Sequence, residues 1–178
     1  MNPEKILLHY YNPTSRVFQI LLEHSLQVRE KATLLATRHP ELSIDLPFAR
    51  EAALLHDVGI FLTRAPGIDC HGEKPYVCHG YLGADLLRAE GLPRHALVCE
   101  RHTGAGISIE TIRAEKLPLP ERDMIPRSIE EELVCFADKF FSKTRPGEEK
   151  TAEQVRAEIA PFGEEAAGRL EKWFRLFS

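Results

Sequence analysis

The sequence predicts an all-α fold of about six to eight helices in a single domain, and three observations support this. Apolar residues recur at spacings of three and four along most of the chain, as they do on the buried faces of helices. Residues that start helices precede these runs, for example Asn2-Pro3 and Ser128. Glycine and proline end them, as at residues 91–93 and 161–163.

Length and composition narrow the class of protein. The chain has 178 residues, of which 43% are hydrophobic and 28% charged, as in soluble globular proteins with their own core. No apolar run approaches the ~20 residues of a membrane span, and the first residues lack a secretory signal, so we expect a cytoplasmic protein with no membrane partner. The four cysteines form no CxxC pair and are expected to be reduced.

The net charge indicates which classes of ligand the protein can bind. A formal charge of -4 and a pI near 6.1 argue against binding to duplex nucleic acid, which needs a broad basic surface. Small phosphorylated ligands fit this charge better than long polymers.

The expected helices follow one another along the whole chain. A short helix opens at Asn2-Pro3, a long one runs from about residue 15 to 38, and a central one starts at Pro47. Residues 60–77 are rich in glycine and proline and are expected to form a loop, whose length is typical of functional loops. The remaining helices are expected over 79–90, 94–102, 128–141, 151–160 and 164–177, and a short helix over 109–115 is an option within a mixed segment. One domain, 1–178, then comprises a motif-bearing core over 15–147 and C-terminal helices over 151–177.

The most informative stretch is residues 52–59, where an apolar helical run ends in His56 and Asp57. Polar side chains directly after a leucine pair are expected to enter the interior, where each needs a partner to offset its desolvation. One metal ion would serve both. Gly59 suits the left-handed position that often follows a last helical turn. The alternative is a His-Asp pair that caps the helix at the surface.

Two further polar residues lie on apolar helical faces. His24 has Leu21 and Val28 as helical neighbours, and a lone histidine in such a place is commonly a core residue bonded to a backbone carbonyl. Asp138 lies in a helix that is apolar nearly all round, where a carboxylate needs a cation or several donors. A salt bridge to an arginine or lysine is the alternative to a metal ion for Asp138.

Two more histidines lie at expected helix ends. His79 begins one helix, and His102 ends the next on an apolar face. Gly83, one turn after His79, predicts either room beside the imidazole or close helix packing. His95 shares the face of His102, but it lies in a first turn, where we expect exposure to solvent.

Four imidazoles and two carboxylates suit a borderline divalent metal such as iron, manganese or zinc, with magnesium as a further option. They are enough for two ions that share a bridging carboxylate, and Asp57 is the natural bridge. The set is His24, His56, Asp57, His79, His102 and Asp138.

The order of these residues resembles that in the HD-domain metal-dependent phosphohydrolases. Residues 56–59 (HDVG) are similar to the HDIG signature of one subgroup, residues 79–84 to its HxxxGA helix start, and Arg101-His102 to its RH segment. Residues 137–147 resemble the ADxxSxxRPG segment in the HD domain of ribonuclease Y. The similarity covers roughly residues 21–147 and implies an HD-type helical domain around a buried metal site.

This resemblance implies a role for each matching residue. A first ion would be bound by His24, His56, Asp57 and Asp138. A second would be bound by His79 and His102 with Asp57 shared, so that His56 and Asp57 form the catalytic centre. Many members carry Lys or Glu three residues after the Asp, where this chain has Ile60. The candidates for binding the phosphate oxygens are Lys139, Arg145 and Arg101.

The predicted function is hydrolysis of a phosphomonoester or phosphodiester in a nucleotide-like substrate, by attack of a metal-activated water. Two alternatives remain open. Some HD-fold proteins use the same ligands as di-iron oxygenases, and the absence of a charged residue at Ile60 is compatible with a non-catalytic, ligand-binding HD module. The aromatic stripe of the last helix, with Trp173 and Phe177, predicts core packing or a subunit contact, which leaves a homodimer open.

Overall fold

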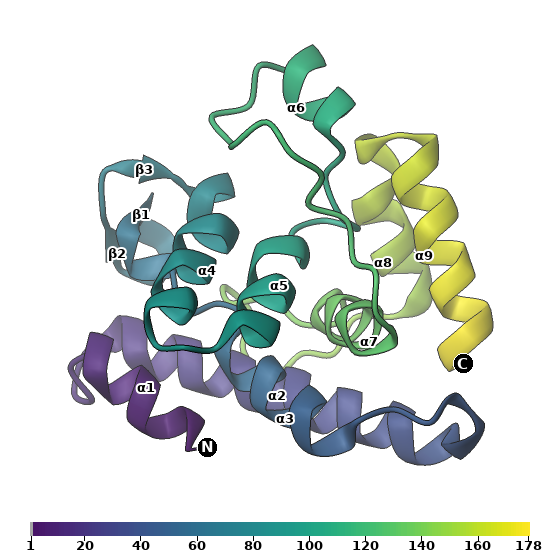
Figure 1. Ribbon diagram of the computed structural model, residues 1–178, viewed down its shortest axis with the longest axis horizontal. Helices are drawn as coiled ribbons and strands as arrows, with labels where there is room; N and C mark the ends of the chain where they lie inside the picture. The colour runs from purple at the N-terminus through teal and green to yellow at the C-terminus, as the bar shows by residue number, and fades with distance from the viewer. Residues whose placement is uncertain (1) are drawn as a thin grey trace.

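The computed structural model describes residues 2–178, and within this range it has nine α-helices and one small sheet (Figure 1). The prediction of an all-α fold is confirmed, with three short strands as an addition. No helix in this range has both the length and the apolar character needed to cross a membrane. The α-helices are α1 (Pro3–Tyr10), α2 (Arg16–Arg38), α3 (Leu46–Leu55), α4 (His79–Ala89), α5 (Pro93–Arg101), α6 (Ile109–Ala114), α7 (Ile129–Asp138), α8 (Ala152–Ile159) and α9 (Glu164–Phe177).

The long helix α2 is the element against which the central helices are arranged. Ser15 begins it, with a side-chain oxygen that accepts the N–H of Phe18, as the sequence predicts. The helix packs along α3 and α7, while α4 and α5 form an adjacent antiparallel pair. Helix α9 packs against α7 at the other side of the molecule (Figure 1).

The segment 60–77, expected to be a loop, is an ordered unit of short strands and 3₁₀ turns. Strand β1 (Thr63–Ala65) lies between β2 (Cys70–His71), with which it pairs antiparallel, and β3 (Lys74–Pro75), with which it pairs parallel. Each strand has two or three residues, which is too short for an alternating apolar pattern to be recognised. Figure 1 places this sheet beside α4.

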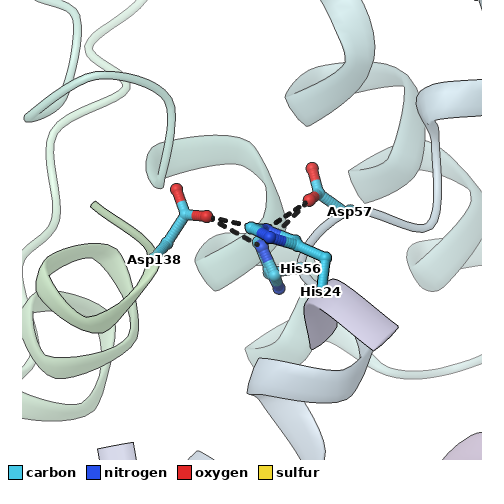
Figure 2. Close-up of side chains that lie close together, drawn as sticks. All are labelled: His24, His56, Asp57 and Asp138. Atoms are coloured by element: carbon cyan, nitrogen blue, oxygen red, sulfur yellow. Dashed lines mark hydrogen bonds and ion pairs between the residues drawn. The ribbon is translucent and has the colours of Figure 1, made fainter. Parts of the chain in front are cut away.

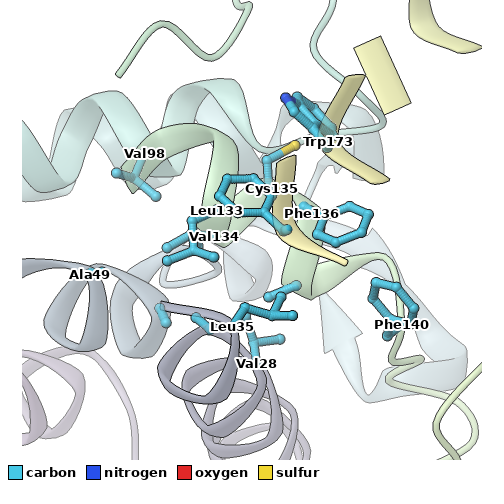
Figure 3. Close-up of a cluster of buried hydrophobic side chains, with 14 of the residues drawn as sticks. Val28, Leu35, Ala49, Val98, Leu133, Val134, Cys135, Phe136, Phe140 and Trp173 are labelled. Carbon is cyan, nitrogen blue, oxygen red and sulfur yellow. The ribbon is translucent and has the colours of Figure 1, made fainter. Parts of the chain in front are cut away.

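Two apolar clusters make up most of the core. The larger one joins α2, α3, α7 and α9 (Figure 3) and includes Phe136, which stacks on Phe177 and meets Trp173 edge-on. The aromatic stripe of the last helix is therefore core. A second cluster includes Leu21 and Leu55. On α2, His24 lies between Leu21 of the second cluster and Val28 of the first, so the polar site lies where the two cores meet.

Helix ends place most of the predicted ligands. Helix α3 ends at Leu55, with His56 as its C-cap residue, and α5 ends just before His102. Helix α4 begins at His79 and α7 ends at Asp138. A helix end leaves backbone groups and side chains without helical neighbours, so these residues can turn inward together.

The role expected for Gly59 is wrong, and the structure shows a different one. Its φ is -87°, in the right-handed region, so no left-handed conformation requires glycine here. A Cβ on Gly59 would instead lie 2.4 Å from the carbonyl oxygen of His79 and from the nitrogen of Gly83. Gly83 in turn is closed in by Gly59 and by the sulfur of Cys99, so it serves close packing and leaves no room for an ion.

Candidate metal centre

The six predicted ligands come together in the interior as two groups that share Asp57. All six side chains are buried, and within each group one potential ligand atom per residue lies within 4.8 Å of the others. The first group is His24, His56, Asp57 and Asp138; the second is Asp57, His79 and His102. Figure 2 shows the first group, with the two imidazoles between the two carboxylates.

Three of the histidines are oriented by the same kind of local hydrogen bond. The Nδ1–H of each ring donates to the backbone carbonyl three residues earlier, at 2.7 Å in all three cases. A carbonyl only accepts, so the proton lies on Nδ1 and the Nε2 lone pair of the neutral ring faces the centre. The pairs are His56 with Ala53, His79 with Tyr76, and His102 with Cys99.

The second group has a donor arrangement that needs a cation. Nε2 of His79 lies 3.0 Å from Nε2 of His102, and the two atoms are 3.3 and 3.4 Å from Oδ1 of Asp57. Burial lowers the pKa of His79 to about 3 and also lowers that of His102, so both rings are neutral at pH 7. Two lone pairs and a carboxylate oxygen then face one another, which is unfavourable unless a positive charge lies among them.

The carboxylates of the first group raise the pKa of His56. Nε2 of His24 lies 2.9 Å from Oδ1 of Asp138, and Nε2 of His56 lies 3.0 Å from Oδ2 of Asp57. Burial acts to lower the pKa of His56, but the Asp57 and Asp138 carboxylates outweigh it and raise the pKa to about 9. The contact with Asp138 shows that His24 is bonded to a carboxylate. It is not a core histidine bonded to a backbone carbonyl, which was the alternative left open by its sequence context.

An orphaned polar atom shows that the residues present fit metal ions. Oδ1 of Asp57 faces only the neutral imidazoles of His79 and His102 and has no hydrogen-bond donor among the described residues, whereas Oδ2 has the ammonium of Lys143 as its ion-pair partner. Buried polar atoms without partners are costly, and a carboxylate is among the most costly. Imidazole nitrogens and carboxylate oxygens in this mixture suit iron, manganese or zinc. The clusters can thus hold divalent metal ions.

Two buried lysines compensate the carboxylates. Nζ of Lys143 lies 2.5 Å from Oδ2 of Asp57, and Nζ of Lys139 lies 2.7 Å from Oδ2 of Asp138. Burial alone would lower the pKa of each lysine, but the facing carboxylate raises it, so both lysines are charged. Conversely, these lysines and the neighbouring histidines hold the pKa values of Asp57 and Asp138 well below the usual range against the effect of burial. Asp138 therefore has the lysine salt bridge that its sequence context left open as an alternative, and it also lies in a group of residues that could hold a metal ion.

The structure brings one of the three predicted phosphate-binding residues to the cluster. Lys139 lies at Asp138 and also donates to the carbonyl of His102 at 3.1 Å. The Arg101 guanidinium turns instead to both oxygens of Glu131, at 3.1 and 2.8 Å. Arg145 is exposed in the turn after α7, where its backbone N–H donates to the carbonyl of Ser142.

Sequence reasoning missed Lys143. The residue lies five positions after Asp138, and helical spacing would place it on a different face from Asp138. Helix α7 ends at Asp138, however, and the following turns, closed by an isolated bridge between Ser142 and Arg145, bring Lys143 back to Asp57. The cluster of basic residues in 139–145 was the signal available in the sequence. It does not indicate which lysine points inward.

Ile60 and His95, two further residues singled out in the sequence, are both buried. Ile60, at the position where the family resemblance would place a charge, is fully buried in the second apolar cluster, so no charged group acts from there. The expectation that His95 is exposed is wrong. It is only 9% exposed, because α3 covers the first turn of α5: its ring contacts Phe48, and its Nε2 lies 3.3 Å from Glu51.

The sequence comparisons agree with this geometry. The sequence model of the HD domain family matches residues 21–142, a range that includes all six residues of the cluster. This chain belongs to the HD domain family. HD domains bind divalent metals, so the family and the donor set of the site point to the same cofactor class.

Several known proteins are similar over much of this chain. An uncharacterized protein of Methanocaldococcus jannaschii is 37% identical over 128 residues, 70% of this chain and 68% of that protein. A tRNA (cytidine(56)-2'-O)-methyltransferase of Thermoplasma volcanium is 34% identical over 161 residues, 89% of this chain but 42% of that protein. A ribonuclease Y of Desulforamulus reducens is 31% identical over 153 residues, 86% of this chain but 24% of that protein. The chain spans less than half of the two named enzymes, and no solved structure matches it.

Proposed function

We propose that this HD domain is a metal-dependent phosphohydrolase that cleaves a phosphomonoester or phosphodiester of a nucleotide-like substrate. The observation that carries the proposal is the position of Asp57 between two donor groups, with Oδ2 toward His24 and His56 and Oδ1 toward His79 and His102. A carboxylate shared in this way is the natural bridge of a two-ion site. We also assign the chain to the HDIG-type subgroup, on the strength of residues 56–59 and 79–84.

The proposed division of labour follows from the donor groups. His24, His56, Asp57 and Asp138 would hold one ion, and His79, His102 and Asp57 the other. When bound, such a pair supplies an activated water at neutral pH and positive charge for the phosphoryl oxygens. The chain itself supplies two further positive charges, on Lys139 and Lys143, directly beside the carboxylates.

Lys143 supplies the charged group that is absent at Ile60. Its ammonium faces Asp57, only 12% of its side chain is exposed, and it lines the cavity that opens beside Asp138. Once metal ions neutralise Asp57, this ammonium is placed to pair with a phosphate oxygen. A positive charge at this point favours an anionic substrate. It argues against the alternative of an HD module that carries out no phosphate chemistry.

The names of two relatives support a nucleotide-like substrate. Ribonuclease Y and the tRNA methyltransferase are both named for action on RNA, and the matching part of each is similar to nearly the whole of this chain. A nucleotide or an RNA-derived phosphate ester is therefore the first class of substrate to test.

The test is metal analysis combined with a substrate screen. The purified protein, loaded in turn with manganese, iron or zinc, should hydrolyse at least one mononucleotide, dinucleoside polyphosphate or cyclic dinucleotide, and chelator should abolish this activity. Metal-loaded protein that is inert toward all of them would refute the proposal. Oxygen consumption with a redox-dependent iron spectrum would then identify the oxygenase alternative, and ligand binding without turnover the binding-module alternative.

A further inference from the structure

A cavity of about 400 Å³ opens from the metal centre toward the C-terminal part of the chain. Its walls include the largely buried Asp138 and Lys143 of the centre, and Ile159 and the exposed Phe162 of the C-terminal part. This volume falls within the ~300–1,000 Å³ typical of small-molecule sites. Residues of the cluster and residues of the last helices thus border one continuous space.

At the metal centre, this cavity is lined by two lysines whose positive charges would be available to a ligand once metal ions bind the facing carboxylates. The ammonium groups of Lys139 and Lys143 line it, and each faces a carboxylate that metal ions would neutralise. Farther along, Lys150 is paired with Glu158 at 2.5 Å, and both line the cavity. The far part therefore has no surplus positive charge for a second phosphate group.

The far end of the cavity presents an exposed aromatic ring. Phe162 is 64% exposed, whereas every other phenylalanine in residues 2–178 is buried or half-buried. It lies in the 3₁₀ turn Ala160–Phe162 between α8 and α9, outside the residues 21–142 that the HD family model matches. An exposed ring at the edge of a cavity is available to stack on a planar ligand, and each base stacked in this way gains affinity.

We infer that this cavity binds a mononucleotide, with its phosphate at Lys143 and its base stacked on Phe162. The inference deepens the proposed function and rests on it. Two lysine ammonium groups at the metal centre, one exposed aromatic ring in the cavity wall and a third lysine that is already paired favour a ligand with one phosphate and one base, and disfavour a bare sugar phosphate or a dinucleoside polyphosphate. The C-terminal segment would then determine substrate choice, while the HD core supplies the chemistry.

The decisive test separates base binding from hydrolysis. Adenosine, guanosine, cytidine and uridine, which carry no phosphate, are titrated into wild type, Phe162→Ala and Phe162→Leu by isothermal titration calorimetry. Leu8→Ala is the matched control, because Leu8 is another exposed apolar side chain, on α1 and away from this cavity. In parallel, kcat/KM is measured for adenosine 5'-monophosphate and for ribose 5-phosphate, its counterpart without a base.

We expect at least one nucleoside to bind wild type and Leu8→Ala equally. Phe162→Ala should weaken that binding about 5- to 100-fold, with Phe162→Leu in between, and should lower kcat/KM for the nucleotide but not for ribose 5-phosphate. Absence of nucleoside binding, or equal binding by wild type and Phe162→Ala, would overturn the inference even if hydrolysis is found. Binding that depends on Phe162 in a protein that hydrolyses nothing would support the base site and refute the proposed hydrolase.

Discussion

At the scale of single residues, the function depends on how Asp57 divides its two oxygens. Oδ2 faces His24, His56 and Lys143, and Oδ1 faces His79 and His102. The side chain is fully buried, and Oδ1 has no hydrogen-bond donor among the described residues. Each neighbouring residue therefore acts on one donor group, whereas Asp57 acts on both.

Replacing His79 should remove one ion and leave the other. His79→Ala takes a ligand from the second group only, so metal analysis should fall from about two ions per chain to about one, and turnover should fall on the order of 100-fold or more. Asp57→Ala should lose both ions and all measurable turnover. Wild-type turnover by His79→Ala at saturating metal would rule out a two-ion mechanism. Circular dichroism checks that both variants keep their helices.

Metal binding to the first group should release a proton. Only the neutral ring of His56 can bind metal, and its pKa of about 9 means that roughly 1% of the rings are neutral at pH 7. Affinity should rise about tenfold per pH unit between pH 6.5 and 8.5, and about one proton should leave per ion bound.

The second group supplies the internal comparison, because the pKa of His79 is lowered to about 3 and no proton has to leave it at neutral pH. Calorimetry with manganese in two buffers of different ionisation enthalpy counts the released protons for wild type and for His79→Ala, which retains only the first group. Buffer-independent heats at pH 7 would contradict the assignment.

Removing the charge of Lys143 should change metal affinity and catalysis in opposite directions. Lys143→Met keeps the length of the side chain but leaves Asp57 without its cation, so metal should bind more tightly, on the order of tenfold. The variant also lacks the proposed partner of the phosphate oxygen, so kcat/KM should fall about 10- to 100-fold. Equilibrium metal titration and steady-state kinetics measure the two effects. A parallel fall in both would mean that Lys143 only stabilises the fold.

At the scale of elements, the site depends on how closely the end of α3 approaches α4. His56 and Asp57 follow α3 directly, His79 begins α4, and the two segments touch through the backbones of Gly59 and Gly83. Side chains larger than hydrogen at these positions would push the segments apart. The distance between the two donor groups is thus set by backbone packing between neighbouring elements.

Gly59→Ala tests this contact. The new Cβ would meet backbone atoms at 2.4 Å, which cannot rotate away, so the free energy of unfolding should fall by about 1–3 kcal/mol. Metal binding should weaken with it, because His79 shifts relative to Asp57. Gly168→Ala is the matched control: it lies in α9 with nothing within 4 Å of the new Cβ, and it should stabilise by about 0.5–1 kcal/mol. Urea unfolding measures both. Equal effects of the two substitutions would contradict the packing role of Gly59.

At the scale of the whole molecule, the metal centre joins segments that are far apart in the sequence. Its six residues come from α2, α4 and α7, and from the residues directly after α3 and α5, and they lie between the two apolar clusters. An ion bound there links both cores. Without it, buried carboxylates and imidazoles rely on two lysines and on one another.

Chelation should therefore lower thermal stability. A ligand that binds only the folded state, present at a thousandfold excess over its Kd, stabilises by about 4 kcal/mol, which corresponds to roughly 10 °C in Tm for a chain of this size. Differential scanning fluorimetry with manganese, with chelator and with manganese restored measures the effect. Asp57→Ala is the control, whose Tm should not respond to manganese. A wild-type Tm that is independent of metal would contradict the linking role.

The sequence by itself determined the features that depend on local pattern. The helical periods and the helix-starting residues Ser15 and Ser128 predict α2 and the start of α7 closely, because spacing and capping act over a few residues, although α7 ends at Asp138 and not at residue 141. The six polar residues at apolar helical positions identify the cluster, since each is costly to bury without a partner. The resemblance to the HD family assigns them to two ions that share Asp57.

Only the tertiary structure decided the features that depend on contacts between distant segments. The turn after α7 brings Lys143 rather than Arg145 to Asp57, α3 buries His95, and α4 requires glycine at position 59. The exposure of Phe162 beside the cavity is likewise a property of how α8 and α9 pack on the core. Spacing along the chain reports which face of its own helix a residue occupies. It contains no information on what another segment places against that face.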